Sequence, residues 1–165
     1  MATSPKSGEK TPDQQQLPAQ KAQREPQDAA YARAQDAIAT ARTSGASHLT
    51  LSGDDFSDLT ELPPDIGTLT ALTDLSLSGT QVSDISALSG LTALSGLSLL
   101  GTPVNDLSPI LPLTQLVDAP KYGGLAFRNT AAARADRRIA EIAGIQDDAK
   151  RATDLCAYLK NVTPT

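Results

Sequence analysis

The sequence repeats itself at a step of 22 residues, and this repeat constrains the fold more than any other feature. The segment LTDLSLSGTQVSDISAL at 72–88 aligns with LSGLSLLGTPVNDLSPI at 94–110. The matching apolar residues are Leu72, Leu75, Leu77, Val82, Ile85 and Leu88 in the first copy, and Leu94, Leu97, Leu99, Val104, Leu107 and Ile110 in the second. A Gly-Thr pair and an aspartate also recur, so each copy is expected to form one structural unit.

The spacing of the leucines within one copy predicts a short strand followed by a return loop. In the L-x-L segment the two leucines share one face, because side chains alternate along a strand. The later apolar residues of the copy must return to the same core, so the chain has to turn through a loop or a short helical turn. One copy alone has nothing against which to bury its apolar face, and stacking of successive copies supplies that neighbour.

Two further segments extend the pattern at longer steps. Upstream, Leu49 and Leu51 form an L-x-L pair that lies 26 residues before the pair of the first clear copy. Downstream, Leu125 and Phe127 in YGGLAFRNT form a similar pair, 28 residues after the pair of the second copy. We therefore predict parallel strands that place the following leucines side by side: Leu49, Leu75, Leu97 and Leu125.

The common pattern L-x-x-L-x-L-x-G-T-x-V-x-D-[IL] resembles the leucine-rich repeat. Its length and the segments TQVSDISAL and TPVNDLSPI are similar to the internalin-like class of bacterial repeats. The resemblance covers residues 46–130 and implies an α/β solenoid, a short right-handed stack of about four coils with parallel strands on its concave face. It also places Thr80 and Thr102 where the family has an Asn that satisfies backbone groups. Asp84 and Asp106 are expected to cap the short helical turns that follow them.

Segments on both sides of the repeats predict helices that cover the ends of the stack. Residues 28–45 are rich in Ala and place Tyr31, Ala34, Ile38 and Ala41 on one helical face. Residues 131–165 contain two helical segments, which predict an αα-hairpin as the C-terminal cap. Residues 1–27 hold Pro, Gln, Ser and Lys with almost no large apolar side chain, which predicts a disordered tail.

The net charge of −5 is unevenly distributed along the chain. Residues 46–118 contain nine acidic side chains and neither Lys nor Arg, whereas residues 119–165 have more basic than acidic groups. An acidic repeat region argues against nucleic-acid binding, which needs clustered Lys and Arg. The same charge favours encounter with a basic protein partner. We expect a monomer that binds no nucleic acid.

The sequence contains no apolar stretch long enough to cross a bilayer, and polar residues follow the initial Met where a secretory signal would be apolar. The single Cys excludes an internal disulfide. We therefore expect a cytoplasmic protein without membrane association. The alternative is an exported bacterial effector, because a polar N-terminal tail also suits a specialised secretion system.

The residue types that carry catalysis or bind metals are scarce in this chain. Cys156 is the only thiol, and it stands beside Leu155 on a predicted helix, where a structural role is expected. His48 is the only imidazole and cannot form a zinc site alone. The acidic residues around Asp54 and Asp58 lack the spacing of a calcium loop, which favours solvated carboxylates. We predict a protein that is not an enzyme and binds neither cofactor nor metal.

The remaining candidate for function is the face of the predicted strands that points away from the leucines. The partner-binding residues predicted on it are His48, Thr50, Asp74, Ser76, Ser98, Leu100 and Arg128. Interface hot spots are rich in large side chains, and the larger ones in this set are His48, Asp74, Leu100 and Arg128. We predict a non-enzymatic protein–protein interaction module. The alternatives are a structural scaffold or spacer, which a smooth face of Ser and Gly favours, and an exported effector acting through its caps or tail.

Overall fold

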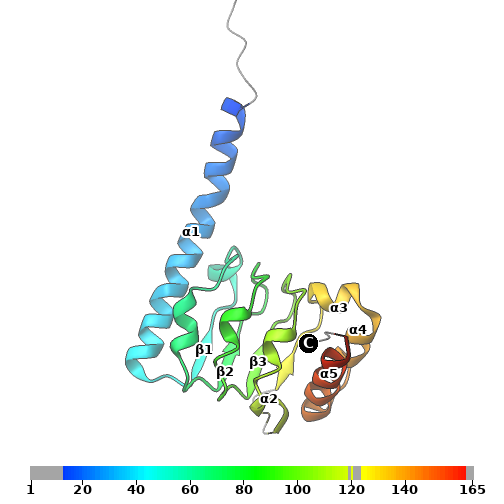
Figure 1. Ribbon diagram of the computed structural model, residues 1–165. Helices are drawn as coiled ribbons and strands as arrows, with labels where there is room; N and C mark the ends of the chain where they lie inside the picture. The colour runs from blue at the N-terminus through cyan, green and yellow to red at the C-terminus, as the bar shows by residue number, and fades with distance from the viewer. Residues whose placement is uncertain (1–12, 119, 121–123, 163–165) are drawn as a thin grey trace, which may run out of the picture.

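The computed structural model of the chain describes residues 13–118, 120 and 124–162, with side chains described from residue 28 onward. Within these residues the protein is an α/β protein built on one parallel sheet. The strands are β1 (His48–Thr50), β2 (Asp74–Ser76), β3 (Gly96–Ser98) and β4 (Leu125–Ala126), which lie in the sheet in chain order. Figure 1 shows this row of strands between an N-terminal helix at one end and C-terminal helices at the other.

The pairing of the strands confirms the register predicted from the leucine spacing. Leu49 pairs with Leu75, Leu75 with Leu97, and Leu97 with Leu125. Leu49 is 8% exposed, and the other three leucines are at most 3% exposed. Because side chains alternate along a strand, the residues on either side of each leucine point to the opposite face of the sheet.

Short 3-10 helices lie in the links between the strands. The first link contains Asp54–Phe56 and Pro64–Thr68, the second Ser86–Leu88, and the third Ser108–Ile110 followed by the helix α2 (Gln115–Asp118). Apolar residues of these links, such as Val82 and Ile85, are buried in one core with the strand leucines. The links therefore return the chain to the same core after each strand.

The two aspartates of the repeat lie two residues before their 3-10 helices, one position ahead of the N-cap residues Ile85 and Leu107, and each bonds the first N–H of the helix. Asp84 accepts a hydrogen bond from the N–H of Ser86 at 2.8 Å, and Asp106 accepts one from the N–H of Ser108 at the same distance. The bond from Ser86 lowers the pKa of Asp84. Both carboxylates satisfy a backbone donor at the start of a helical turn, where such donors have no partner within the helix.

Buried threonines fix the turn that follows β2, β3 and β4. Thr80, Thr102 and Thr130 are 0% exposed. Each hydroxyl donates to the carbonyl oxygen three residues earlier, at 2.8–2.9 Å. Since a buried hydroxyl without a partner costs free energy, these bonds allow a polar residue to lie inside the core. Thr80 and Thr102 thus satisfy backbone groups, as the sequence predicted.

The helix α1 (Asp13–Ser44) covers the β1 end of the sheet. Its buried residues are Ala30, Ala34, Ile38 and Ala41, while Tyr31, predicted for this face, is only half-buried. The helix begins at Asp13 instead of near residue 28, and it extends past the rest of the molecule (Figure 1). The backbone of residues 13–27 belongs to this helix, and the predicted disorder of residues 1–27 stays a prediction. Residues 1–12 of the predicted tail lie outside the described residues.

Within the described residues, three helices close the β4 end instead of the predicted αα-hairpin. They are α3 (Ala131–Ala135), α4 (Arg137–Ala143) and α5 (Asp148–Val162). Asp136 has an extended backbone between α3 and α4, and its carboxylate accepts the N–H groups of Arg138 and Ile139 at 2.7 and 3.3 Å. An aspartate that caps the following helix competes with continuation of the preceding one, so the segment predicted as one helix is divided at this residue.

Candidate functional site

The outer face of the sheet, opposite the leucine core, contains an open hollow of about 260 Å³. Its lining comes from all four strands or the residues next to them, and these residues are called the strand face below: His48, Thr50, Asp74, Ser76, Gly96, Ser98, Gly124 and Ala126. Backbone of the leucine positions contributes to its floor. The structure thus brings together most of the predicted partner-binding residues, namely His48, Thr50, Asp74, Ser76 and Ser98.

His48 and Asp74 lie side by side at the β1 end of the strand face, where β1 and β2 pair them in register. Nε2 of His48 is 3.5 Å from Oδ2 of Asp74, and Oγ of Ser47 is 2.7 Å from Nδ1 of His48. Thr73 donates its hydroxyl to the same Oδ2 at 3.1 Å. The His48 side chain is 54% exposed and that of Asp74 is 15% exposed. The hollow therefore has a partly desolvated carboxylate at one end.

Hydroxyl groups and glycines make up the middle of the strand face. Ser78 and Ser98 share a hydrogen bond of 2.7 Å, and the Ser76 hydroxyl lies 3.4 Å from that of Ser78. Gly96 pairs with Asp74 in register, and Gly124 immediately precedes β4. Because hydroxyls both donate and accept, this region can adapt to polar groups of either kind. Both glycines are buried, and side chains of Pro120 and Asp148 lie over Gly124.

Leu100 and Arg128, the other predicted partner-binding residues, do not line the hollow. Arg128 donates from Nε to the carbonyl oxygen of Ala143 at 2.9 Å and from a terminal nitrogen to that of Gly144 at 3.3 Å. It thus binds the C-terminal end of α4, where unpaired carbonyl groups favour a cation. Leu100 lies just beyond β3 and is 40% exposed. The period of the repeat placed both residues on the outward side, but it carried no information about where α4 would end.

The sequence analysis missed Ser47 and Thr73, which contact His48 and Asp74 of the strand face. Each comes directly before the residue that it contacts, and Thr73 also donates to the carbonyl oxygen of Ser47 at 3.0 Å. The available signal was a hydroxyl residue immediately before His48 and another before Asp74. The repeat pattern drew attention to the strand residues alone, so this signal was not used.

Ser47, His48 and Asp74 are also the residue types of a hydrolase triad, in which an acid orients a histidine that activates a serine. Here the imidazole is 54% exposed and stands at the rim of an open hollow. Triad chemistry depends on hydrogen-bond donors arranged in a site from which water is excluded. The geometry therefore suits hydrogen bonding to a bound group better than it suits catalysis.

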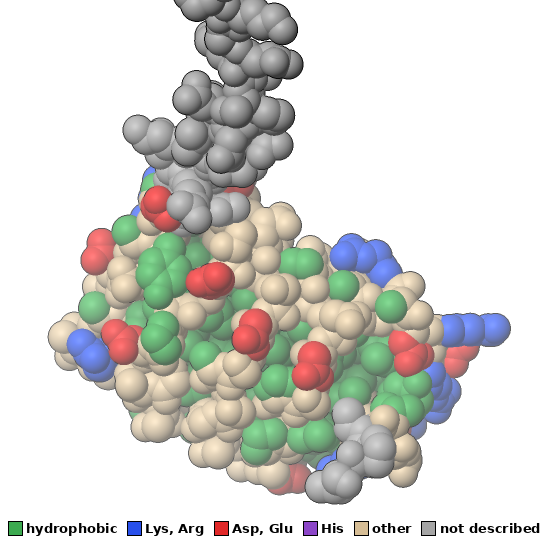
Figure 2. Space-filling view, turned by 45° about the horizontal axis from the view of Figure 1, so that its top comes forward, with side chains coloured by type: hydrophobic (Ala, Val, Ile, Leu, Met, Phe, Trp, Pro, Cys, Tyr) green, Lys and Arg blue, Asp and Glu red, His purple; other side chains and the backbone are tan. Residues whose placement is uncertain are grey.

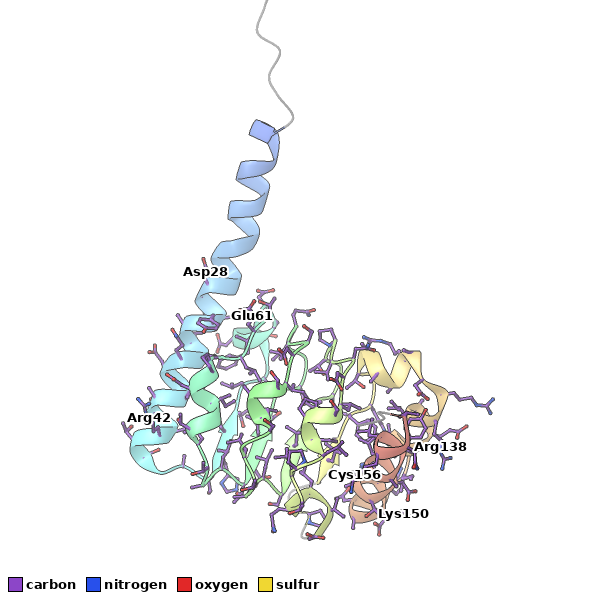
Figure 3. The ribbon with its side chains drawn as sticks, in the orientation of Figure 1. Asp28, Arg42, Glu61, Arg138, Lys150 and Cys156 are labelled. Atoms are coloured by element: carbon purple, nitrogen blue, oxygen red, sulfur yellow. The ribbon has the colours of Figure 1, made fainter. Side chains whose placement is uncertain are left out.

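Cys156 lies on α5 (Figure 3), beside a second hollow of about 380 Å³ between α2 and α5. Burial raises the pKa of its thiol, and the nearby charge of Lys160 partly offsets this effect. A thiol with a raised pKa is protonated at neutral pH and is a weak nucleophile. In the part of the chain that the structure describes, no group of three His, Cys, Asp or Glu side chains is placed to hold a metal ion.

Charge is segregated on the surface of the molecule. Figure 2 shows acidic side chains spread across the middle of the body and basic ones gathered toward its ends. Arg138 and Lys150, at the C-terminal end in Figure 3, pair locally with Glu141 and Asp154 at 3.3 and 2.9 Å. Exposed pairs of this kind contribute little to stability. They nevertheless offset part of the positive charge of the C-terminal helices, so the acidic body dominates the field near the sheet.

Comparisons of the sequence with known proteins found no matching protein-family model and no matching curated protein. Among the helices of the described residues, none combines the length and the apolar character required to cross a membrane. The assignment of function therefore depends on the geometry and charge of the strand face.

Proposed function

We propose that this chain is a leucine-rich-repeat solenoid whose strand face binds another protein. Two observations support the leucine-rich-repeat part. Equivalent leucines of successive units stand in direct register across the sheet, and equivalent threonines make the same hydrogen bond after β2, β3 and β4. A stack of repeats exposes an apolar surface at each end, and the positions of α1 and α3–α5 fit the caps that such a stack needs.

The observation that carries the binding function is the accessibility of the outward side chains of the strands. The core buries one face of each strand, whereas His48 and Thr50 are exposed and Asp74, Ser76 and Ser98 are half-buried around the hollow. His48 contacts Ser47 and Asp74, Ser76 and Ser98 both contact Ser78, and none of the five side chains belongs to the leucine core. A hollow between small polar side chains can accept groups that project from a partner surface.

The proposed partner is a basic protein, and the chain acts on it as a monomeric, non-enzymatic module. Residues 46–118, which include β1–β3, carry acidic groups without any Lys or Arg. Such a surface accelerates encounter with a positively charged protein and disfavours acidic ones. Because the charges are mostly exposed, salt should weaken the association. The cytosol is the proposed compartment.

A structural scaffold is the second candidate, and the contacts of Arg128 favour it. Interface hot spots are rich in Arg, Tyr and Trp. Arg128 is bound to the end of α4, which leaves His48 and Asp74 as the largest polar side chains among the described residues of the strand face. A face with so few anchors is compatible with a spacer whose strands bind nothing.

Two matched arginine substitutions separate these functions. Ser98→Arg fills the hollow, whereas Ser83→Arg places the same charge at an exposed serine outside it. Tagged intact protein is used for affinity capture from a native lysate, with quantitative mass spectrometry as the readout. A protein captured by the wild type and Ser83→Arg but lost by Ser98→Arg supports binding at the strand face. Equal capture by both variants supports the scaffold and contradicts the proposal. Thermal unfolding confirms that both variants fold.

A further inference from the structure

The hollow on the strand face is smaller than a site for a small-molecule ligand or cofactor. Its volume is about 260 Å³, below the roughly 300–1,000 Å³ typical of such sites. It is also open, so a chain segment can enter it from outside. These dimensions fit a single side chain that projects from another protein.

Asp74 gives this hollow one charged end. The contacts that the described residues make with its carboxylate, from the hydroxyl of Thr73 and from Nε2 of His48, both involve Oδ2. In this arrangement Oδ1 keeps its capacity to accept hydrogen bonds. With 15% of the side chain exposed, the carboxylate is reachable yet partly removed from water. Interactions with a cation are stronger in such a position than at a fully exposed carboxylate.

The floor of the hollow beside Asp74 has no side chains along one row. Gly96 stands in register with Asp74 on the next strand, and Gly124 lies beyond it before β4. Both glycines are buried, and the side chains of Pro120 and Asp148 fill the space above Gly124. The hydroxyls of Ser76 and Ser98 flank this row. A flexible aliphatic stem can therefore lie along the half-buried hydroxyls of Ser76 and Ser98 with its polar head at Asp74.

We propose that the strand face binds an arginine side chain of the partner, with the guanidinium on Asp74 and the stem beside Ser76 and Ser98. This inference rests on the proposed function. A guanidinium is planar, matches a carboxylate through paired N–H groups and is weakly hydrated, whereas the lysine ammonium is compact and strongly hydrated. Residues 46–118 contain no Arg, and Arg128 is bound to α4, so neither the sheet region nor Arg128 supplies this guanidinium. The acidic surface favours a cationic group of a partner.

The test compares two small probes on the intact protein, N-acetyl-L-arginine methylamide and the neutral isostere N-acetyl-L-citrulline methylamide. The readout is the amide spectrum in ¹H–¹⁵N NMR titrations at about pH 7.5, where an ordinary histidine is largely neutral. The arginine probe should shift the amide resonances of Asp74, Ser76 and Gly96, and the citrulline probe should bind about tenfold more weakly. Asp74→Asn should lose the response to the arginine probe. The control Asp84→Asn should keep it, because Asp84 lies on a 3-10 turn outside the hollow.

Equal responses to the two probes, no response to the arginine probe, or an unchanged response in Asp74→Asn would each overturn the inference. The comparison of probes on the wild-type protein needs no variant, so it remains decisive if Asp74→Asn fails to fold. The capture experiment separates the two levels of the proposal. Loss of the partner in Ser98→Arg with retention in Asp74→Asn contradicts the arginine site and leaves the proposed function standing. Retention in Ser98→Arg contradicts the proposed function itself.

Discussion

The buried threonines allow a direct measurement of what stabilises the turn after a strand. Thr102 is 0% exposed, and its hydroxyl donates to the carbonyl oxygen of Leu99 at 2.8 Å. The same carbonyl also accepts the backbone N–H of Thr102 at 3.3 Å. Thr102→Val preserves the shape of the side chain and replaces the hydroxyl with a methyl group. Because the carbonyl keeps its backbone donor, the expected loss is the net value of one hydrogen bond, about 1 kcal/mol.

Two further substitutions calibrate this value. Thr102→Ala removes a buried methyl group as well as the hydroxyl, so it should cost about 2 kcal/mol in total. Thr92→Val changes an exposed threonine in the link between β2 and β3. A surface change of that kind should stay within about 0.5 kcal/mol of the wild type.

The assay is urea unfolding monitored by circular dichroism. The free energies of unfolding are compared using the same dependence on urea concentration (m value) for all variants. For a chain of this length, a loss of 1 kcal/mol corresponds to a fall of roughly 2–4 °C in Tm. Thr80→Val should give the same loss as Thr102→Val, because Thr80 makes the equivalent bond. If the valine variants are as stable as the wild type, the hydroxyls do not stabilise the turns and the reasoning is wrong. A loss at only one of the two positions would show that the units are not equivalent.

Three other predictions concern the backbone, the pH dependence and the C-terminal helices. Gly101 has φ +72°, a conformation that Ala disfavours. Gly101→Ala should therefore lower the free energy of unfolding in urea by about 1–2 kcal/mol. Gly101→Asn should lower it less, since Asn tolerates this conformation. The hydroxyl of Tyr158 donates to Asp136 at 2.6 Å, which lowers the pKa of Asp136 and raises that of Tyr158. The stability from this bond is therefore fully present between the ordinary pKa values of 3.8 and 10.0, and it is lost as pH falls through the lowered pKa or rises through the raised one. Tyr158→Phe should accordingly differ from the wild type in that window and converge with it at both extremes, as measured by thermal unfolding against pH. Arg151 donates from Nε to the carbonyl oxygen of Leu125 at 2.6 Å in a buried position, so Arg151→Met should cost about 3 kcal/mol and expose α5 to hydrogen exchange before the sheet opens.

The strand register could be predicted because it follows from the alternation of side chains alone. A strand shifted by one residue would turn its leucines toward solvent, so the apolar pattern fixes the pairing whatever the length of the link. The steps on either side of the clear repeat are longer, yet Leu49 and Leu125 still pair with Leu75 and Leu97. The additional residues are taken up by a second 3-10 helix in the first link and by α2 in the third.

The division of the C-terminal helix at Asp136 and the contacts of Arg128 could not be predicted in the same way. Residues around Asp136 have a continuous helical pattern, and the aspartate is held by Tyr158 from α5 as well as by its own capping bonds. Arg128 binds carbonyl groups of Ala143 and Gly144. Both features depend on how elements distant in sequence meet in space, about which local periodicity carries no information.

The repeat that fixes the core also determines how the candidate site varies across the sheet. Because equivalent outward positions of successive strands are aligned, one row of the strand face consists of His48, Asp74, Gly96 and Gly124, and the adjacent row of Thr50, Ser76, Ser98 and Ala126. Charged and hydroxyl side chains therefore stand at the β1 end, and the rows become small and apolar toward β4. A partner on this face therefore meets side chains whose polarity decreases from β1 to β4, in the direction perpendicular to the strands. Its orientation is then set by which end of its surface carries the cation, because Asp74 is the one carboxylate among the described residues of the strand face, and Asp148, which lies over Gly124 at the β4 end, is paired with Arg151.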